Sequence, residues 1–85
     1  MSMQTVNMAQ IQTTLLDVLS NLAPEKDLSL YESNTGIQEA LDIDSFDYLN
    51  FLIELESLYG VAVPEADYDQ LVTLDDVVDY LLDRL

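Results

Sequence analysis

Ser45 is the residue of this sequence whose setting raises the question of chemistry most directly. It lies in the stretch LDIDSFDYLNFLIELE, residues 41–56, between two aspartates and a phenylalanine. A catalytic serine needs a histidine or another base beside it, and the chain has no histidine and no G-x-S-x-G pattern. It has no cysteine either, so the best thiol nucleophile is missing. We therefore predict that the chain is not a self-sufficient enzyme.

The clustered aspartates could instead bind a metal ion, but their spacing is wrong for a calcium-binding loop. An EF-hand loop that opened at Asp42 would have Phe46 at its fifth position and Ile53 where a bidentate glutamate is needed. A loop that opened at Asp67 would have Val78 at that last position. We therefore predict no metal site.

The first residue of the helix that follows decides whether the Ser45 hydroxyl is free. If Ser45 capped the helix, the third helical residue would be Tyr48, which cannot complete a capping box. If Asp44 caps it, the third residue is Asp47, and both acids lie at the positive end of the helix. Ile43 and Tyr48 then fall at hydrophobic staple positions. We predict the second arrangement, in which the Ser45 hydroxyl points outward beside unpaired amides that favour a phosphate group.

The helix predicted over residues 45–59 has two unlike faces, when each residue is turned by about 100° from the last. The broad apolar arc, with Glu56 near its edge, holds Tyr48, Leu49, Phe51, Leu52, Leu55, Leu58 and Tyr59. The opposite side holds Asp47, Asn50, Glu54 and Ser57, together with the apolar Phe46 and Ile53. Phe46 and Ile53 are open to two interpretations. They form a contact spot for a partner, or they belong to a wide core arc tucked under a long loop.

Helical periodicity appears in two further runs. The first covers residues 6–23, where Thr5 or Asn7 can cap the start and Pro24 stops the helix. The second covers residues 73–85, where Thr73 and Asp76 resemble a capping box. Gly60 suits the end of the helix over residues 45–59. We predict an all-α protein, a small antiparallel bundle of three main helices plus one short helix.

Two connections join these helices. Residues 23–43 contain turn signals around ESNTG. This connection also carries apolar side chains at Leu28, Leu30, Tyr31, Ile37 and Leu41. We therefore expect it to pack across the bundle. The shorter connection, GVAVPEADYDQLV, can hold one or two helical turns after Pro64.

The composition fits one small acidic domain. The 85 residues predict a single domain over residues 1–85 with a frayed terminus at residues 1–4, and 49% hydrophobic residues exclude a disordered chain. The chain has no apolar run long enough to span a membrane and no secretory signal pattern, so we expect a cytoplasmic monomer. The net charge of −15 repels nucleic acid and anionic lipid, and it attracts basic protein surfaces.

At residues 41–46 the chain resembles the acyl carrier proteins. The signature of that family is an LGxDSL segment that opens an acidic helix, and this sequence has LDIDSF in its place. The similarity continues through a helix that ends at an aromatic residue and a glycine, a VAVP link, a short helix and a last helix capped by threonine. It covers the chain from about Thr5 to Leu85.

The resemblance implies a function and a site. Ser45 is expected to carry 4′-phosphopantetheine, and Asp44 to flank it as the helix cap. The thiol that the sequence lacks would then come with this prosthetic group, on which the protein would hold acyl intermediates as thioesters for fatty-acid, lipid or secondary-metabolite synthesis. The expected partners are a phosphopantetheinyl transferase and acyl-loading and acyl-transferring enzymes with basic patches. The expected recognition residues are Phe46, Asp47, Asn50, Ile53, Glu54, Glu56 and Ser57.

Three departures from the family pattern leave other functions open. Phe46 replaces the commoner leucine or methionine, as also happens in D-alanyl carrier proteins, so an aminoacyl or peptidyl cargo is an alternative. Asn50 replaces an acid that is usual in fatty-acid-synthesis members, and Asp42 replaces the usual glycine. These changes favour a specialised carrier with a dedicated pathway. An unmodified acidic interaction protein is the alternative from another class.

Overall fold

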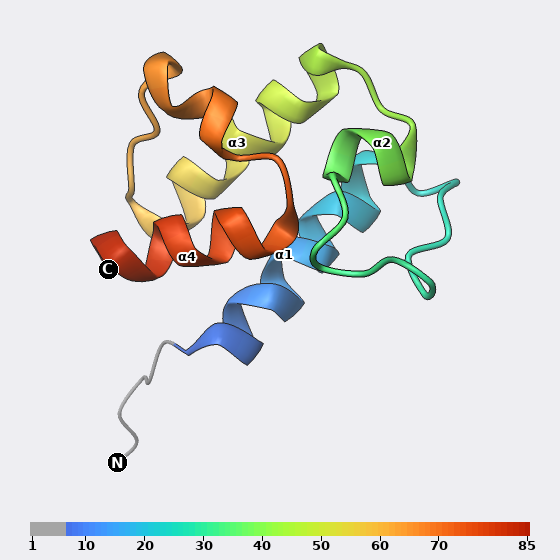
Figure 1. Ribbon diagram of the computed structural model, residues 1–85, viewed down its shortest axis with the longest axis horizontal. Helices are drawn as coiled ribbons and strands as arrows, with labels where there is room; N and C mark the ends of the chain where they lie inside the picture. Colours follow the sequence, from blue (N-terminus) through green and yellow to red (C-terminus); the bar gives the residue numbers. More distant parts are fainter. Residues whose placement is uncertain (1–6) are drawn as a thin grey trace.

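The structure is a computed structural model, and it describes residues 7–85. Its elements follow one another along the chain as α1 (Met8–Leu22), α2 (Ile37–Leu41), α3 (Ser45–Tyr59), the 3₁₀ helix η1 (Glu65–Gln70) and α4 (Leu74–Arg84) (Figure 1). Residues 7–85 contain no strand, only one isolated bridge between Gly36 and Thr73. The predicted all-α fold with three main helices is therefore confirmed. None of the described helices is long and apolar enough to cross a membrane.

The start and end of α1 follow local rules that the sequence displays. The Asn7 side chain accepts a hydrogen bond of 2.9 Å from the amide of Gln10, so Asn7 is the cap. Thr5, the other candidate, lies outside the described residues, as does the predicted fraying of residues 1–4. The helix ends at Leu22, just before Pro24, which cannot continue it.

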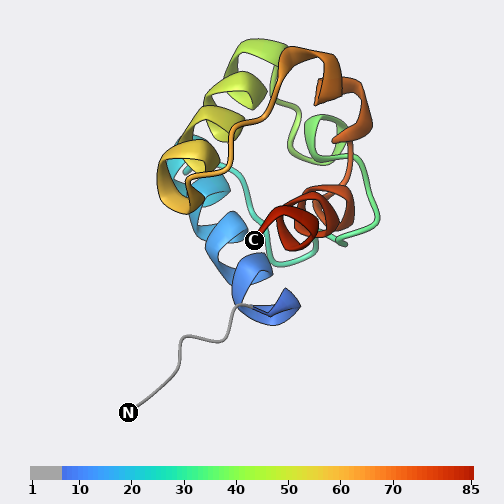
Figure 2. The same ribbon diagram turned by 90° about the vertical axis from the view of Figure 1, so that its left-hand side faces the viewer.

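The core forms where α1 packs against both α3 and α4. Figure 2 shows α1 and α3 on one side of the molecule and η1 and α4 on the other. The largest fully buried side chains are Ile11, Leu15, Leu19, Ile37, Phe51, Leu52, Leu55, Leu74, Val77, Val78 and Leu81. No polar or charged side chain among residues 7–85 is buried, so the acidic groups lie at the surface.

The short connection folds as the sequence predicts. Gly60 ends α3 with a φ of 70°, in the left-handed region that glycine adopts without strain. After Pro64, the two turns of η1 lead to α4. The Tyr80 hydroxyl donates a 2.7 Å hydrogen bond to Asp67, and the Arg84 guanidinium lies 3.8 Å from the same carboxylate. This cluster holds η1 against α4.

The long connection differs from the prediction in two ways. Leu30 does not pack across the bundle, because 86% of it is exposed. The connection also contains α2, a second short helix, whose five residues are too few to show a helical period in the sequence. Ile37 and Leu41 of α2 are buried, and Leu28 and Tyr31 are half-buried against the core. The connection therefore packs on the bundle as expected, except at Leu30.

Candidate functional site

The start of α3 has the geometry that the sequence predicts. The Asp44 carboxylate accepts a 2.8 Å hydrogen bond from the amide of Asp47, and the amide of Tyr48 donates to the Asp44 carbonyl at 3.1 Å. Asp44 is therefore the cap, and Ser45 is the exposed first residue of the helix. The bond from Asp47 satisfies one of the four amides that have no partner within the helix, and the bond from Tyr48 is the first ordinary bond of the helix. The amides of Ser45 and Phe46 have no acceptor within residues 7–85.

The turn before α3 sets the position of Ser45. Asp42 ends α2 with a φ of 53°, in the left-handed region that glycine adopts most easily. The amides of Asp42 and Ile43 both donate to the Gln38 carbonyl, which closes the end of α2. The chain can then reverse into α3 within a few residues.

One neighbour of Ser45 could not be predicted from the sequence. The side-chain amide of Gln38, on α2, donates to the Ser45 hydroxyl over 3.5 Å. Gln38 is half-buried and lies seven positions before the serine in a stretch without a helical pattern. Only the fold of α2 brings the two side chains together.

The inner face of α3 anchors the helix in the core. Tyr48, Phe51, Leu52 and Leu55 are buried, and the Tyr48 hydroxyl donates to the carbonyl of Leu71. Burial raises the pKa of the Tyr48 phenol well above its usual value, so the group remains a donor at neutral pH. The buried arc is narrower than predicted, because Leu58 is 51% exposed and Leu49 and Tyr59 are only half-buried.

The outer face of α3 carries the residues that the sequence nominated for recognition. Phe46 is 69% exposed and Ile53 is 52% exposed, so the long loop does not cover them. Asp47 and Asn50 are half-buried, and Glu54, Glu56 and Ser57 are exposed. A rotation of about 100° per residue puts all of these on one face except Glu56, which lies at the edge of the other side.

The geometry at Ser45 suits a phosphate ester. The hydroxyl is exposed, and the free amides of Ser45 and Phe46 stand at the positive end of a helix of 15 residues. The side-chain amide of Gln38 is a further donor beside the serine oxygen. The Asp44 carboxylate is held by the amide of Asp47 and remains at the cap.

Comparison with known proteins gives one consistent result. The family described as "Phosphopantetheine attachment site" matches residues 9–81. The acyl carrier protein of Syntrophobacter fumaroxidans is 29% identical over 77 residues, which cover 89% of this chain and 93% of the relative. The acyl carrier proteins of Lactobacillus acidophilus and Campylobacter lari are 33% and 34% identical over 64 residues, 75% of this chain and 78% and 80% of theirs. The chain therefore belongs to the acyl carrier protein family, whose members are non-catalytic proteins that carry phosphopantetheine.

Proposed function

We propose that Ser45 is the residue to which 4′-phosphopantetheine is attached. The observation that carries this proposal is the start of α3, where an exposed hydroxyl lies beside two free amides and the amide of Gln38. The other serines of the described residues are Ser20, Ser29, Ser33 and Ser57. None of them is the first residue of a helix.

The chain's own residues supply attachment and orientation. The prosthetic group supplies the thiol that forms a thioester, which this chain cannot supply because it contains no cysteine. Ser45 would hold the group through its hydroxyl oxygen, and the amides of Ser45 and Phe46 would be available as donors to the phosphate. Asp44 fixes the first turn through Asp47, so these donors keep their direction.

The enzymes that act on the cargo would dock on the outer face of α3. Phe46 and Ile53 form its apolar part, and Asp47 and Glu54 lie beside them on the same side of the helix. Such a surface suits a partner that has an apolar contact surrounded by basic residues. A phosphopantetheinyl transferase and the acyl-loading and acyl-transferring enzymes are the expected partners.

The cargo that best fits the relatives is an acyl group, because those relatives are acyl carrier proteins. We propose a discrete carrier that works in the cytoplasm in fatty-acid, lipid or secondary-metabolite synthesis. The carrier role rests on the family and on Ser45, whereas the departures at Phe46 and Asn50 favour a specialised carrier with a dedicated pathway.

Intact mass spectrometry tests the attachment site. The purified protein is incubated with coenzyme A and a broad-specificity phosphopantetheinyl transferase. The wild type and Ser57→Ala are expected to gain the mass of one phosphopantetheine group, and Ser45→Ala is expected to gain nothing. Ser57 is the matched control because it is exposed on the same helix but lies away from its start. A mass gain that survives Ser45→Ala overturns the proposal.

Steady-state kinetics of the same transferase test the docking face. Ile53→Ser is expected to raise KM severalfold with kcat little changed, because it removes a contact and not a reacting group. Leu58→Ser is the control, since Leu58 is 51% exposed against 52% for Ile53 but faces another side of α3. Equal effects of the two substitutions would show that the transferase does not dock on the outer face of α3.

A further inference from the structure

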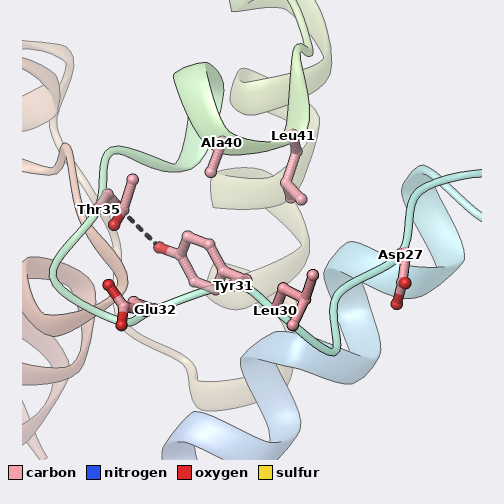
Figure 3. A pocket seen from close by; sticks show the side chains of 7 residues that line it. All are labelled: Asp27, Leu30, Tyr31, Glu32, Thr35, Ala40 and Leu41. Carbon is pink, nitrogen blue, oxygen red and sulfur yellow. Dashed lines mark hydrogen bonds between the residues drawn. The ribbon is translucent and has the colours of Figure 1, made fainter.

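A pocket of about 180 Å³ lies under α2, on the long connection, where the structure leaves Leu30 in solvent. Figure 3 shows its lining: Leu30, Tyr31, Ala40 and Leu41 provide the apolar part, Thr35 is polar, and Asp27 and Glu32 lie on opposite sides of Leu30 and Tyr31. None of the seven lining residues belongs to α3. The pocket is therefore separate from the proposed attachment and docking residues.

The floor of the pocket, at Tyr31, is tied to α4 by hydrogen bonds. The Tyr31 hydroxyl donates to the Thr35 carbonyl at 2.8 Å and accepts from the amide of Leu74 at 3.2 Å (the first of these bonds is drawn in Figure 3). The amide of Asp75 donates to the Ser33 carbonyl at 3.0 Å. A surface held in this way loses little conformational entropy when a ligand binds.

The two carboxylates give the pocket a defined charge. Asp27 accepts a 3.0 Å hydrogen bond from the amide of Ser29, and this bond holds the pKa of Asp27 below its usual value. The protein as a whole has a net charge of −15. A second copy of the chain, a nucleic acid or an anionic membrane would therefore be repelled from this surface.

We propose that this pocket is a second docking site, which binds an apolar side chain of a basic partner protein. The apolar side chain would contact Leu30, Tyr31 and Leu41, and flanking lysine or arginine residues would pair with Asp27 and Glu32. Such a site would let partners recognise the long connection as well as α3. It does not require modification of Ser45.

A peptide titration followed by amide NMR tests the proposal. The probe is acetyl-Arg-Leu-Arg-amide, and the control is acetyl-Arg-Ser-Arg-amide, which has the same charge without the apolar side chain. The leucine peptide is expected to shift the amide signals of Leu30, Tyr31 and Leu41, and the serine peptide to shift them much less. Leu30→Ala is expected to weaken binding of the leucine peptide about fivefold, the effect of losing part of one apolar contact.

Matched variants make the outcomes decisive. Leu30 and Glu32 are exposed, so Leu30→Ala and Glu32→Gln should fold normally, which circular dichroism checks. Glu32→Gln should also weaken binding, whereas Met8→Ala, an exposed apolar residue of α1, should leave it unchanged. Ser45→Ala should bind the peptide as the wild type does. The peptide titration therefore tests the second docking site independently of the proposal that Ser45 carries the prosthetic group. Equal shifts from both peptides, or shifts centred on Phe46 and Ile53, would overturn the second docking site.

Discussion

The starts of α3 and α4 use the same capping chemistry but differ in how many amides they leave free. At α4, Thr73 and Asp76 form a full capping box, with hydrogen bonds of 3.0 Å in both directions. At α3, Asp44 makes one side-chain cap bond, to the amide of Asp47, and nothing returns to the cap residue. The start of α4 is therefore a closed helix end, and the start of α3 is an open one.

The long connection closes the start of α4. The amide of Leu74 donates to the Tyr31 hydroxyl, and the amide of Asp75 donates to the Ser33 carbonyl. With the bonds from Asp76 and Val77 to Thr73, all four first-turn amides have acceptors. At α3 the amides of Ser45 and Phe46 have none within residues 7–85. A helix start that the fold satisfies is structural, and a start that it leaves open can receive a ligand.

The largest effect is expected from breaking the closed start. Tyr31→Phe removes the acceptor of the Leu74 amide and the donor to the Thr35 carbonyl, so it should lower the free energy of unfolding by about 2 kcal/mol. Urea denaturation measures this change. Tyr59→Phe is the control, because the Tyr59 hydroxyl makes no hydrogen bond within residues 7–85. If the two variants are equally stable, the connection does not close α4 as described.

Removing each cap in turn sharpens the comparison. Thr73→Ala and Asp44→Ala should each cost about 1 kcal/mol of stability, the usual value of a helix cap. Only Asp44→Ala should also slow phosphopantetheine loading, because it releases the first turn that carries Ser45. Thermal unfolding and a loading time course give the two readouts. A Thr73→Ala variant that loads as slowly as Asp44→Ala would mean that loading reports stability alone.

The turn that leads into α3 provides a smaller effect of the opposite sign. Asp42 has a φ of 53°, a conformation that costs aspartate more than glycine. Asp42→Gly should therefore stabilise the protein by about 0.5–1 kcal/mol. Asp42→Asn is the control, since it removes the same charge without removing the side chain. If both variants gain equally in melting temperature, charge and not backbone conformation is the cause.

The smallest effect concerns the net charge of the whole protein. The net charge is −15, and both ion pairs within residues 7–85 involve Arg84. Screening of the repulsion among the acids should raise the melting temperature by a few degrees between about 0.01 M and about 1 M salt. Differential scanning calorimetry measures this rise. A melting temperature that stays flat or falls would show that the acids are better paired than they appear.

The two starts also show what a sequence can and cannot predict. The caps at Asp44 and Thr73 and the end at Gly60 depend on residues within a few positions of each other, and the structure confirms each of these predictions. The Tyr31–Leu74 bond joins residues 43 positions apart, and the Gln38–Ser45 contact depends on a helix of five residues. Neither of these two contacts leaves a periodic or local signal in the sequence. The prediction that Leu30 packs on the bundle is wrong. Leu30 is apolar like its neighbours Leu28 and Tyr31, which do pack against the core, so residue type alone does not distinguish it from them.

The phosphate's position relative to the two helix starts is the most direct test of the central claim, which is that the open start of α3 receives it. Amide NMR spectra of the protein before and after phosphopantetheine loading give the measurement. The account predicts that the largest shifts fall on the amides of Ser45 and Phe46, and that those of Leu74 and Asp75 stay in place. Loading that leaves Ser45 and Phe46 unmoved, or that shifts the start of α4 instead, would contradict it.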